Sequence, residues 1–319
     1  MLSRRDHIMS KNNPPFEITL LAMKLMAKFG SLPKLLQVRW TGQLTDGMFQ
    51  SALASFILFS PERQPDAVKA ALAFEEPQWL DIAEQNMKFL LKVFQDREED
   101  QWLHTYKNGI ARYSAFLDDL SYLVQALITL FEPTGNLLYL EKARTILRYI
   151  QANYIDENGT FFYYTPSFQK DVLVRKKDIY DGAMPSSNAL MAWNLYKAGI
   201  LLGEDGWKRQ SAQMLLTVTE GVIKYPNSFG VWANLMLEMT QGTHEILVLG
   251  PEAHEKGTKL LTHYIPNKVV MLATEIDDQY PLMQQKSLTA NTLFYVCRDY
   301  TCQLPQKDQH EVLLKVLTK

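Results

Sequence analysis

The feature that most constrains the fold of this chain is a residue pattern that returns after sixty positions. Segments 77–96 and 137–156 align without a gap, and a third, looser copy begins at Trp207. A two-helix unit repeated at this interval is typical of stacked helical hairpins, each of which buries one face against the next. The repeat therefore predicts a mainly α protein. The corresponding residues are Trp79 and Tyr139, Ala83 and Ala143, and Asp96 and Asp156.

Near the C-terminus the helical pattern gives way to alternating strands and helices. Strand-like runs are expected at 245–249, 268–273 and 292–297, with helices at 252–264 and 306–317. A strand, a helix and a second strand with short connections favour a parallel pair joined by a right-handed crossover. No glycine-rich fingerprint follows the first strand, so we predict no nucleotide site there.

Composition excludes several classes of partner. With 47% hydrophobic and 21% charged residues among 319, the chain reads as globular. A net charge of −2 and a pI near 6.3 provide no electrostatic footprint for nucleic acid or an anionic membrane, and we expect neither as a partner. No signal-type or membrane-spanning apolar run occurs, so a cytoplasmic location is expected.

Acidic residues stand at the mouths of two predicted helices. Asp118 and Asp119 precede an apolar run, and Asp181 precedes a helix whose first turn suits Pro185. If both helices open onto one cavity, Asp118 or Asp119 stands across from Asp181, and two such carboxylates can perform acid/base chemistry on a sugar. The simpler interpretation is that Ser114 caps the first helix, that its acids offset the helix dipole, and that Asp181 caps a turn.

Aromatic and polar residues gather in the loops that follow the repeated helices. Because the C–H faces of sugars stack on aromatic rings, rings beside carboxylates suit a carbohydrate ligand. The same rings also serve as ordinary packing residues. The residues predicted to contact a substrate are His104, Tyr106, Arg112, Tyr163, Tyr180, Asn188 and Trp193.

The chain has two cysteines, Cys297 and Cys302, with four residues between them. A thioredoxin-type pair has two intervening residues, and structural zinc would require further ligands such as His263 or His310. We therefore expect reduced, buried cysteines and predict no metal or other cofactor. A regulatory disulfide is the alternative interpretation.

Four motifs resemble, in order and spacing, those of the YyaL-like family, whose members resemble spermatogenesis-associated thioredoxin-domain proteins. The resemblance covers about residues 67–319. The motifs are Phe116-Leu117-Asp118-Asp119, then Tyr180-Asp181-Gly182-Ala183 with Pro185, Ser186 and Asn188, then Pro266-Asn267-Lys268-Val269-Val270, and finally Tyr295-Val296-Cys297 through Cys302 to Pro305.

This resemblance implies an (α/α) toroid similar to six-hairpin glycosidases and N-acylglucosamine 2-epimerases, which in the family follows a thioredoxin-like domain. The chain shows no such domain and no counterpart of the family's upstream Asp-Asp-Lys and Trp-Asn helix before Ala70, which would leave the toroid incomplete. The expected parts are a divergent N-terminal segment at 1–66 with helices at 16–29 and 49–59, toroid hairpins at 67–242, and a small α/β subdomain packed on the toroid at 243–319.

Two functions of different kinds are compatible with these observations. One is a carbohydrate-active hydrolase or epimerase that uses Asp118 or Asp119 with Asp181 as acid and base. The other is a non-catalytic module that binds a thioredoxin-like protein partner. The second predicts carboxylates bonded to backbone donors, with no sizeable pocket between them. A redox-sensing tail at Cys297 and Cys302 is a third hypothesis.

Overall fold

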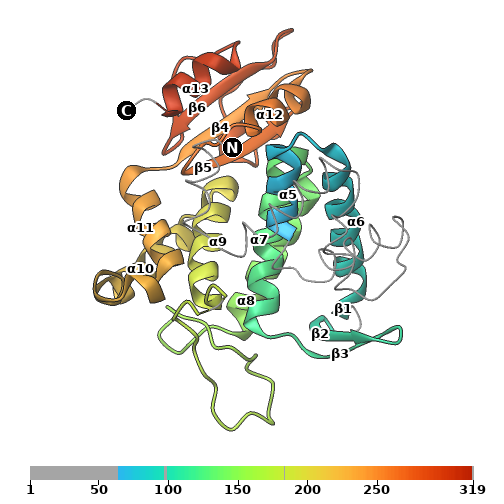
Figure 1. Ribbon diagram of the computed structural model, residues 1–319, viewed down its shortest axis with the longest axis vertical. Helices are drawn as coiled ribbons and strands as arrows, with labels where there is room; N and C mark the ends of the chain where they lie inside the picture. The colour runs from blue at the N-terminus through green and yellow to red at the C-terminus, as the bar shows by residue number, and fades with distance from the viewer. Residues whose placement is uncertain (1–63, 97–98, 183, 318–319) are drawn as a thin grey trace, which may run out of the picture.

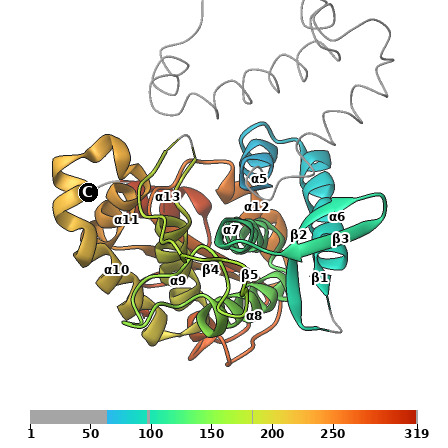
Figure 2. The same cartoon turned by 90° about the horizontal axis from the view of Figure 1, so that it is seen from below.

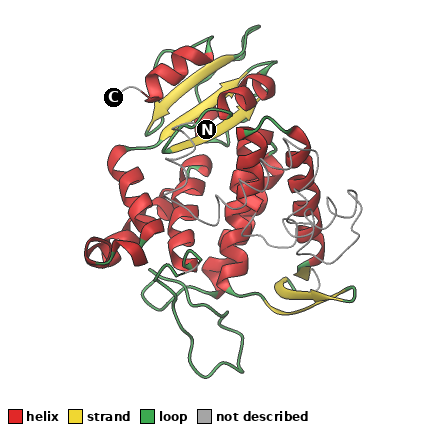
Figure 3. Cartoon of the chain, in the orientation of Figure 1, coloured by secondary structure: helices red, strands yellow, loops and turns green. Residues whose placement is uncertain are grey.

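The computed structural model describes residues 64–96, 99–182 and 184–317, and within them the protein is mainly α with a small α/β part, as predicted (Figure 3). The helices expected at 16–29 and 49–59 lie outside the described residues.

Helical hairpins make up most of the structure and stand side by side in one row (Figure 1). The first helices of the hairpins contact one another in the order α5, α7, α9 and then α11. Within the described residues this row is open, so the toroid stays a prediction. The helices are α5 (Gln64–Ala73), α6 (Pro77–Val93), α7 (Leu117–Thr134), α8 (Leu137–Asn153), α9 (Ser187–Leu202), α10 (Asp205–Lys224) and α11 (Gly230–Gln241), with a 3-10 turn η2 at Pro226–Ser228.

The sixty-residue repeat corresponds to α6 and α8, the second helices of two hairpins. Both contain 17 residues, and both bury the same helical stripe. A hydrogen bond of 2.7 Å from the Tyr139 hydroxyl to Glu84 Oε1 joins the two helices. The sixty-residue spacing is therefore the length of chain from one hairpin to the next. The equivalent buried residues are Ala83 and Ala143, Met87 and Leu147, and Leu90 and Ile150.

The start of α7 corrects one prediction. Ser114 does not cap this helix, because it ends strand β3 and Phe116 is the N-cap residue. The Asp119 carboxylate performs the capping instead, since its Oδ2 accepts the Phe116 N–H at 2.8 Å. Asp119 occupies the third helical position, from which a carboxylate can reach back to the N-cap backbone.

The other end of α7 is held against the sheet. The helix ends at Gly135, whose φ is 60°, a left-handed conformation that glycine adopts without steric cost. A Cβ atom there would lie 2.6 Å from the Leu272 carbonyl oxygen. This close approach anchors α7 beneath the C-terminal sheet.

A small antiparallel sheet joins α6 to α7, with the order β1 (Gln95–Asp96), β2 (Gln101–Lys107) and β3 (Ile110–Ser114). The longer connection from α8 to α9 has no regular strand within its described residues. Its one ladder contact is an isolated bridge between Ile155 and Phe162. Together the β2–β3 hairpin and this connection cover one end of the helical row (Figure 2).

The C-terminal sheet has the order β5-β4-β6-β7, and its β4–β5 pair is parallel, as predicted. Alternate residues of its strands face opposite sides. Leu247 and Met271 join the core shared with the helical row, whereas Val248 and Val270 pack beneath α12 and α13. The elements are β4 (His244–Leu249), α12 (Ala253–Leu261), β5 (Lys268–Ala273), the 3-10 turn η3 (Pro281–Met283), β6 (Leu293–Arg298), β7 (Thr301–Cys302) and α13 (Gln309–Leu317).

Cys297 and Cys302 form a disulfide, so the prediction of reduced cysteines is wrong for this structure. The two residues are direct partners in the antiparallel β6–β7 ladder. Asp299 and Tyr300 both have positive φ, as the central residues of a two-residue hairpin turn do. Four intervening residues therefore give one turn and one further pair, which places the two sulfurs side by side.

Replacing both cysteines by alanine is expected to lower the free energy of unfolding by about 2 kcal/mol. The reason is that a disulfide across so short a loop removes about this much entropy from the unfolded chain. Urea unfolding followed by circular dichroism measures the change. Dithiothreitol should lower the free energy of unfolding of the wild type and should not change that of the double variant. Equal stability of the oxidised wild type and the variant would contradict the prediction.

Candidate active site

The predicted acids lie at the end of the helical row where α7, α9 and α11 begin (Figure 1). The β2–β3 hairpin and the 154–186 connection cover the same end. Helix N-termini present unpaired N–H groups and a partial positive charge, so carboxylates are stabilised there. The electrostatics of this end thus follow from the shared direction of the three helices.

Asp119 joins the hairpin to the start of α7. Its Oδ2 accepts the Phe116 N–H and also lies 2.8 Å from His104 Nδ1, while the His104 ring leans on the Phe116 ring at 4.7 Å between centroids. Burial raises the pKa of Asp119, against the lowering effects of the Phe116 N–H and of His104.

Asp118 presents the unusual carboxylate of the site. Burial raises its pKa, and the nearby hydroxyls of Ser187 and Tyr164 offset only part of this effect. Its Oδ1 atom is buried and meets no partner of good hydrogen-bond geometry among the described residues, and the same holds for the Ser187 hydroxyl. Burying a polar atom without a partner is costly, so Asp118 Oδ1 would be stabilised by a hydrogen-bond donor of a ligand.

Two residues that the sequence did not single out complete this group. Burial raises the pKa of Asp178, and the charges of Asp118 and Asp181 raise it further. Burial also raises the pKa of Tyr164, and the charges of Asp118, Asp119 and Asp178 raise it further. Tyr164 thus lies among three carboxylates, and its ring stacks on Phe116 at 4.8 Å. No local pattern could have distinguished Asp178 from Asp181 or Tyr164 from its neighbour.

Asp181 has both carboxylate oxygens engaged by the backbone. Oδ1 accepts the Ser186 N–H at 2.9 Å, and Oδ2 accepts the Val231 N–H at 2.8 Å. One side chain thereby serves the starts of both α9 and α11. The charge of Asp118 contributes to the raised pKa of Asp178, and Asp181 holds the segment that carries Asp178.

Asn188 supports the site from within the core, whereas Trp193 contacts none of the acids. The Asn188 side chain is buried, and its amide bonds to the Phe162 N–H and carbonyl and to the Asp178 carbonyl. It therefore holds the backbone at Phe162 and at Asp178 in fixed positions. Trp193 lies farther along α9, partly buried, with Lys197 Nζ 5.8 Å from its ring.

The hairpin residues divide between two faces. Arg112 is the ladder partner of Thr105, and alternate residues of a strand point to opposite sides. Arg112 is therefore on the face opposite to that of His104 and Tyr106. The Tyr106 ring packs edge-on against Phe89 at 5.6 Å. Of the three predicted hairpin residues, His104 is the one that contacts an acid.

The last two predicted residues lie outside the acid group. Tyr163 has the Arg175 guanidinium 4.1 Å from its ring centroid and donates its hydroxyl proton to Glu157 at 2.7 Å. Tyr180 is 66% exposed and meets the Phe229 ring edge-on at 5.2 Å.

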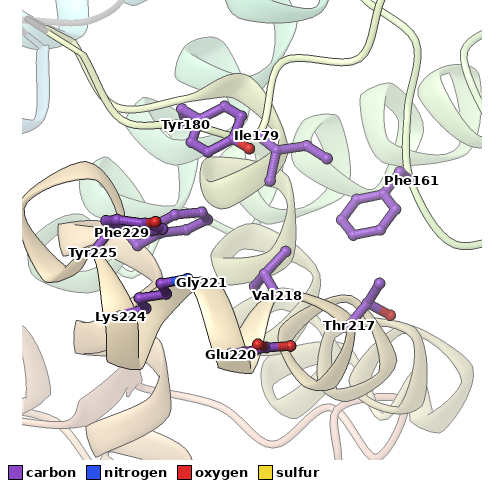
Figure 4. A pocket seen from close by; sticks show the side chains of 10 residues that line it. All are labelled: Phe161, Ile179, Tyr180, Thr217, Val218, Glu220, Gly221, Lys224, Tyr225 and Phe229. Carbon is purple, nitrogen blue, oxygen red and sulfur yellow. The ribbon is translucent and has the colours of Figure 1, made fainter.

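A pocket of about 360 Å³ is lined in part by Ile179 and Tyr180, the two residues that follow Asp178 in the chain (Figure 4). Its walls come from the 179–180 segment, the last turns of α10 and the residues that follow them. None of the predicted catalytic residues Asp118, Asp119 and Asp181 lines it. Residues that line the pocket directly follow Asp178 in the sequence, but the carboxylates and the pocket are two separate features. Lining residues with apolar side chains include Phe161, Ile179, Tyr180, Val218, Tyr225 and Phe229.

Two further classes of feature are absent from the described part of the chain. It contains no group of three or more His, Cys, Asp or Glu side chains placed to hold a metal ion. None of its helices has the length and apolar composition needed to cross a bilayer.

Replacing Asp118 by Asn is expected to raise the free energy of unfolding, increasingly so as pH rises. Because the folded pKa of Asp118 is raised, its contribution is fully present below the unfolded pKa and is lost as pH rises through the folded pKa. Because Asn is neutral at every pH in this range, the free energy of unfolding of the variant does not fall for this reason. Urea unfolding between about pH 4 and pH 8 measures the difference.

Asp205 provides the control of opposite sign, since the hydrogen bond and charge of Lys208 lower its pKa. Asp205→Asn should give no gain that grows with pH. A pH-independent effect of Asp118→Asn would show that the Asp118 carboxylate is not destabilised in the folded state.

Comparison with known proteins supports the family resemblance. No family model matches the chain. Spermatogenesis-associated protein 20 of Homo sapiens is 26% identical over 209 residues, which cover 62% of this chain and 26% of that protein. The Rattus norvegicus protein of the same name is 27% identical over 210 residues, again 62% and 26% of the two chains. Uncharacterized protein B0495.5 of Caenorhabditis elegans is 25% identical over 258 residues, 77% of this chain and 35% of the other.

The matched region spans about a quarter to a third of the length of these relatives. Their names state no reaction, substrate or ligand. The function must therefore be argued from the site itself.

Proposed function

We propose that this protein acts on a carbohydrate, as a hydrolase or an epimerase, through acid/base chemistry by Asp118 and Asp178. The observation that carries the proposal is the half-buried Asp118 carboxyl, which has the hydroxyls of Tyr164 and Ser187 beside it and whose charge contributes to the raised pKa of a second carboxyl, Asp178. Coupled carboxyls whose environments favour the protonated form are the usual apparatus for general acid catalysis near neutral pH.

Exposure assigns the two roles. Asp118 is partly buried and retains its proton to higher pH than an ordinary carboxyl, so it serves as the general acid. The pKa of Asp178 is raised too, but Asp178 is more exposed to solvent than Asp118, so it serves as the base that activates water or withdraws a proton from the substrate. The interaction between the two charges means that their titrations belong to the pair.

The surroundings suit a ligand rich in hydroxyl groups. His104, Phe116 and Tyr164 form a continuous series of rings beside the acids, with centroids 4.7 and 4.8 Å apart. Apolar sugar faces stack on such rings, while the hydroxyls of Tyr164 and Ser187 provide hydrogen-bond partners. The rings and carboxyls together favour a carbohydrate over a purely apolar substrate.

Turnover measured across a panel of glycosides and free sugars tests the proposal. Asp118→Asn and Asp178→Asn should each reduce turnover of an active substrate by about 10²–10⁴-fold, the usual contribution of a positioned acid or base. Asp205→Asn, at an exposed carboxylate on α10, should leave it unchanged. New reducing ends identify hydrolysis, and a changed stereocentre identifies epimerisation. Absence of turnover on every sugar, or full activity of both variants, would refute the proposal.

A specific observation also favours the non-catalytic alternative. Asp119 and Asp181 accept backbone hydrogen bonds, and the pocket does not lie between the carboxylates. Leu173 and Val174, on the same covering connection, are 101% and 70% exposed, as contact residues for another protein would be. Titration with purified thioredoxin tests this function. Binding that Leu173→Ser and Val174→Ser weaken would support it, and absence of binding would count against it.

A further inference from the structure

Four of the ten residues that line the pocket are aromatic. Tyr180, Phe229 and Tyr225 line one side, and Phe161 lies across from them (Figure 4). Tyr180 is 66% exposed, so its ring face is available to a ligand. Tyr225 is 55% exposed as well, whereas Phe161 and Phe229 are buried at 7% and 4%. Exposed tyrosine rings at the edge of a concavity are typical of sites that bind ring-shaped molecules.

A glycine sets the position of one wall. A Cβ atom on Gly221 of α10 would lie 2.8 Å from Cζ of Phe229, too close for the ring to keep its place. Glycine at this position therefore leaves room for the tip of the Phe229 ring at the pocket wall. Gly221 has no left-handed backbone requirement, so alanine there would change the ring position without straining the helix backbone.

The rim of the pocket is polar. Thr217, Glu220 and Lys224 lie three and four residues apart on α10 and so share one helical face. Together they present a hydroxyl, an acceptor and a donor beside the aromatic walls. Apolar faces edged by such groups match a pyranose ring, which has apolar C–H faces and a rim of hydroxyls.

The pocket and the acid group are built on one short stretch of chain. Asp178 interacts with Asp118, and Tyr180 two residues later lines the pocket. Two extended residues span at most about 7 Å. Hydrogen bonds of Asp181 to the starts of α9 and α11 hold this stretch in place. A ligand of two or more sugar rings is long enough to occupy both features at once.

From this arrangement we infer that the pocket is a second sugar-binding subsite and that the substrate is an oligosaccharide, an inference that rests on the proposed carbohydrate function. One ring of the chain lies against the exposed rings of Tyr180 and Tyr225, with its hydroxyls toward Thr217, Glu220 and Lys224. The neighbouring ring reaches Asp118 and Asp178. Binding energy from the pocket holds the reacting ring in position.

Isothermal titration with malto-, cello-, xylo- and chito-oligosaccharides of one to four rings tests the inference. At least one series should bind more tightly once a second ring is present. Tyr180→Ala should weaken that binding by at least about fivefold through loss of ring stacking. Gly221→Ala should weaken it as well, because the added Cβ atom displaces Phe229 and changes the pocket wall. Tyr264→Ala, at a tyrosine that is 85% exposed on the C-terminal part, and Gly206→Ala, at a site with open space, are the matched controls.

Asp118→Asn separates this inference from the proposed function. The variant should lose turnover and keep its preference for longer chains. If Tyr180→Ala and Gly221→Ala bind as the wild type does, the subsite is refuted even where Asp118 is essential for turnover. Equal affinity for one ring and for several rings refutes it too. Absence of binding by every series refutes the subsite, and turnover measurements on the single sugars then decide the proposed function independently.

Discussion

Replacing Lys197 by Met is expected to lower the free energy of unfolding by about 3–5 kcal/mol, because it leaves a buried carboxylate without its counter-charge. Lys197 Nζ lies 2.5 Å from Glu238 Oε1 and 2.6 Å from the Lys268 carbonyl oxygen. Glu238 is 1% exposed, and in the variant its Oε1 would retain the hydroxyl of Thr243 alone. The ammonium group therefore joins α9, α11 and β5.

The double variant Lys197→Met/Glu238→Leu should recover most of this loss, since it removes both charges together. Lys256→Met is the matched control, because Lys256 and Glu252 form a 2.7 Å pair with half-exposed side chains. Exposed pairs contribute at most about 1 kcal/mol. Urea unfolding followed by circular dichroism measures all three variants. Similar losses for Lys197→Met and Lys256→Met would show that the inner pair is not desolvated.

Replacing Asp181 by Ala is expected to lower the free energy of unfolding by about 1–4 kcal/mol, the range for two lost hydrogen bonds of the capping kind. Its two oxygens accept the Ser186 and Val231 N–H groups at 2.9 and 2.8 Å. Hydrogen exchange should become faster at these two amides. Because both lie at helix starts, the effect should remain local to α9 and α11.

Asp181→Asn retains one acceptor oxygen and should give about half the loss of Asp181→Ala. Asp178→Asn is the neighbouring control. The folded pKa of Asp178 is raised, so this variant should cost no stability above neutral pH. Unchanged hydrogen exchange at the Ser186 and Val231 amides in Asp181→Ala would show that the carboxylate does not hold the two helix starts. Asp181 would then again be a candidate catalytic residue.

Local periodicity made the helices and strands predictable. The apolar stripe shared by segments 77–96 and 137–156 depends on residues three and four apart, and α6 and α8 follow it. The run at 268–273 coincides with β5 because β-branched and apolar residues bounded by polar ones need no distant partner to be recognised. The helix cap was missed because Ser114 and Asp119 are both plausible cap residues in sequence, and only the path of the backbone selects between them.

The candidate site was predictable only in part. Asp118 and Asp119 were recognised from their position at a helix mouth, which is a local property. Asp178, Tyr164 and Ser187 were not, since each gains its role from neighbours far along the chain. The cysteine pairing likewise required the β6–β7 turn, because spacing alone does not show that two residues are opposite in a ladder.

By itself the sequence determined where helices and strands form and which of their faces are apolar, since these depend on neighbours within a few residues. The tertiary structure decided which carboxyl group is affected by the charge of Asp118, and which carboxyl group accepts backbone hydrogen bonds. It did so by bringing three helix starts to one end of the row, where burial and charge differ between side chains that are alike in sequence.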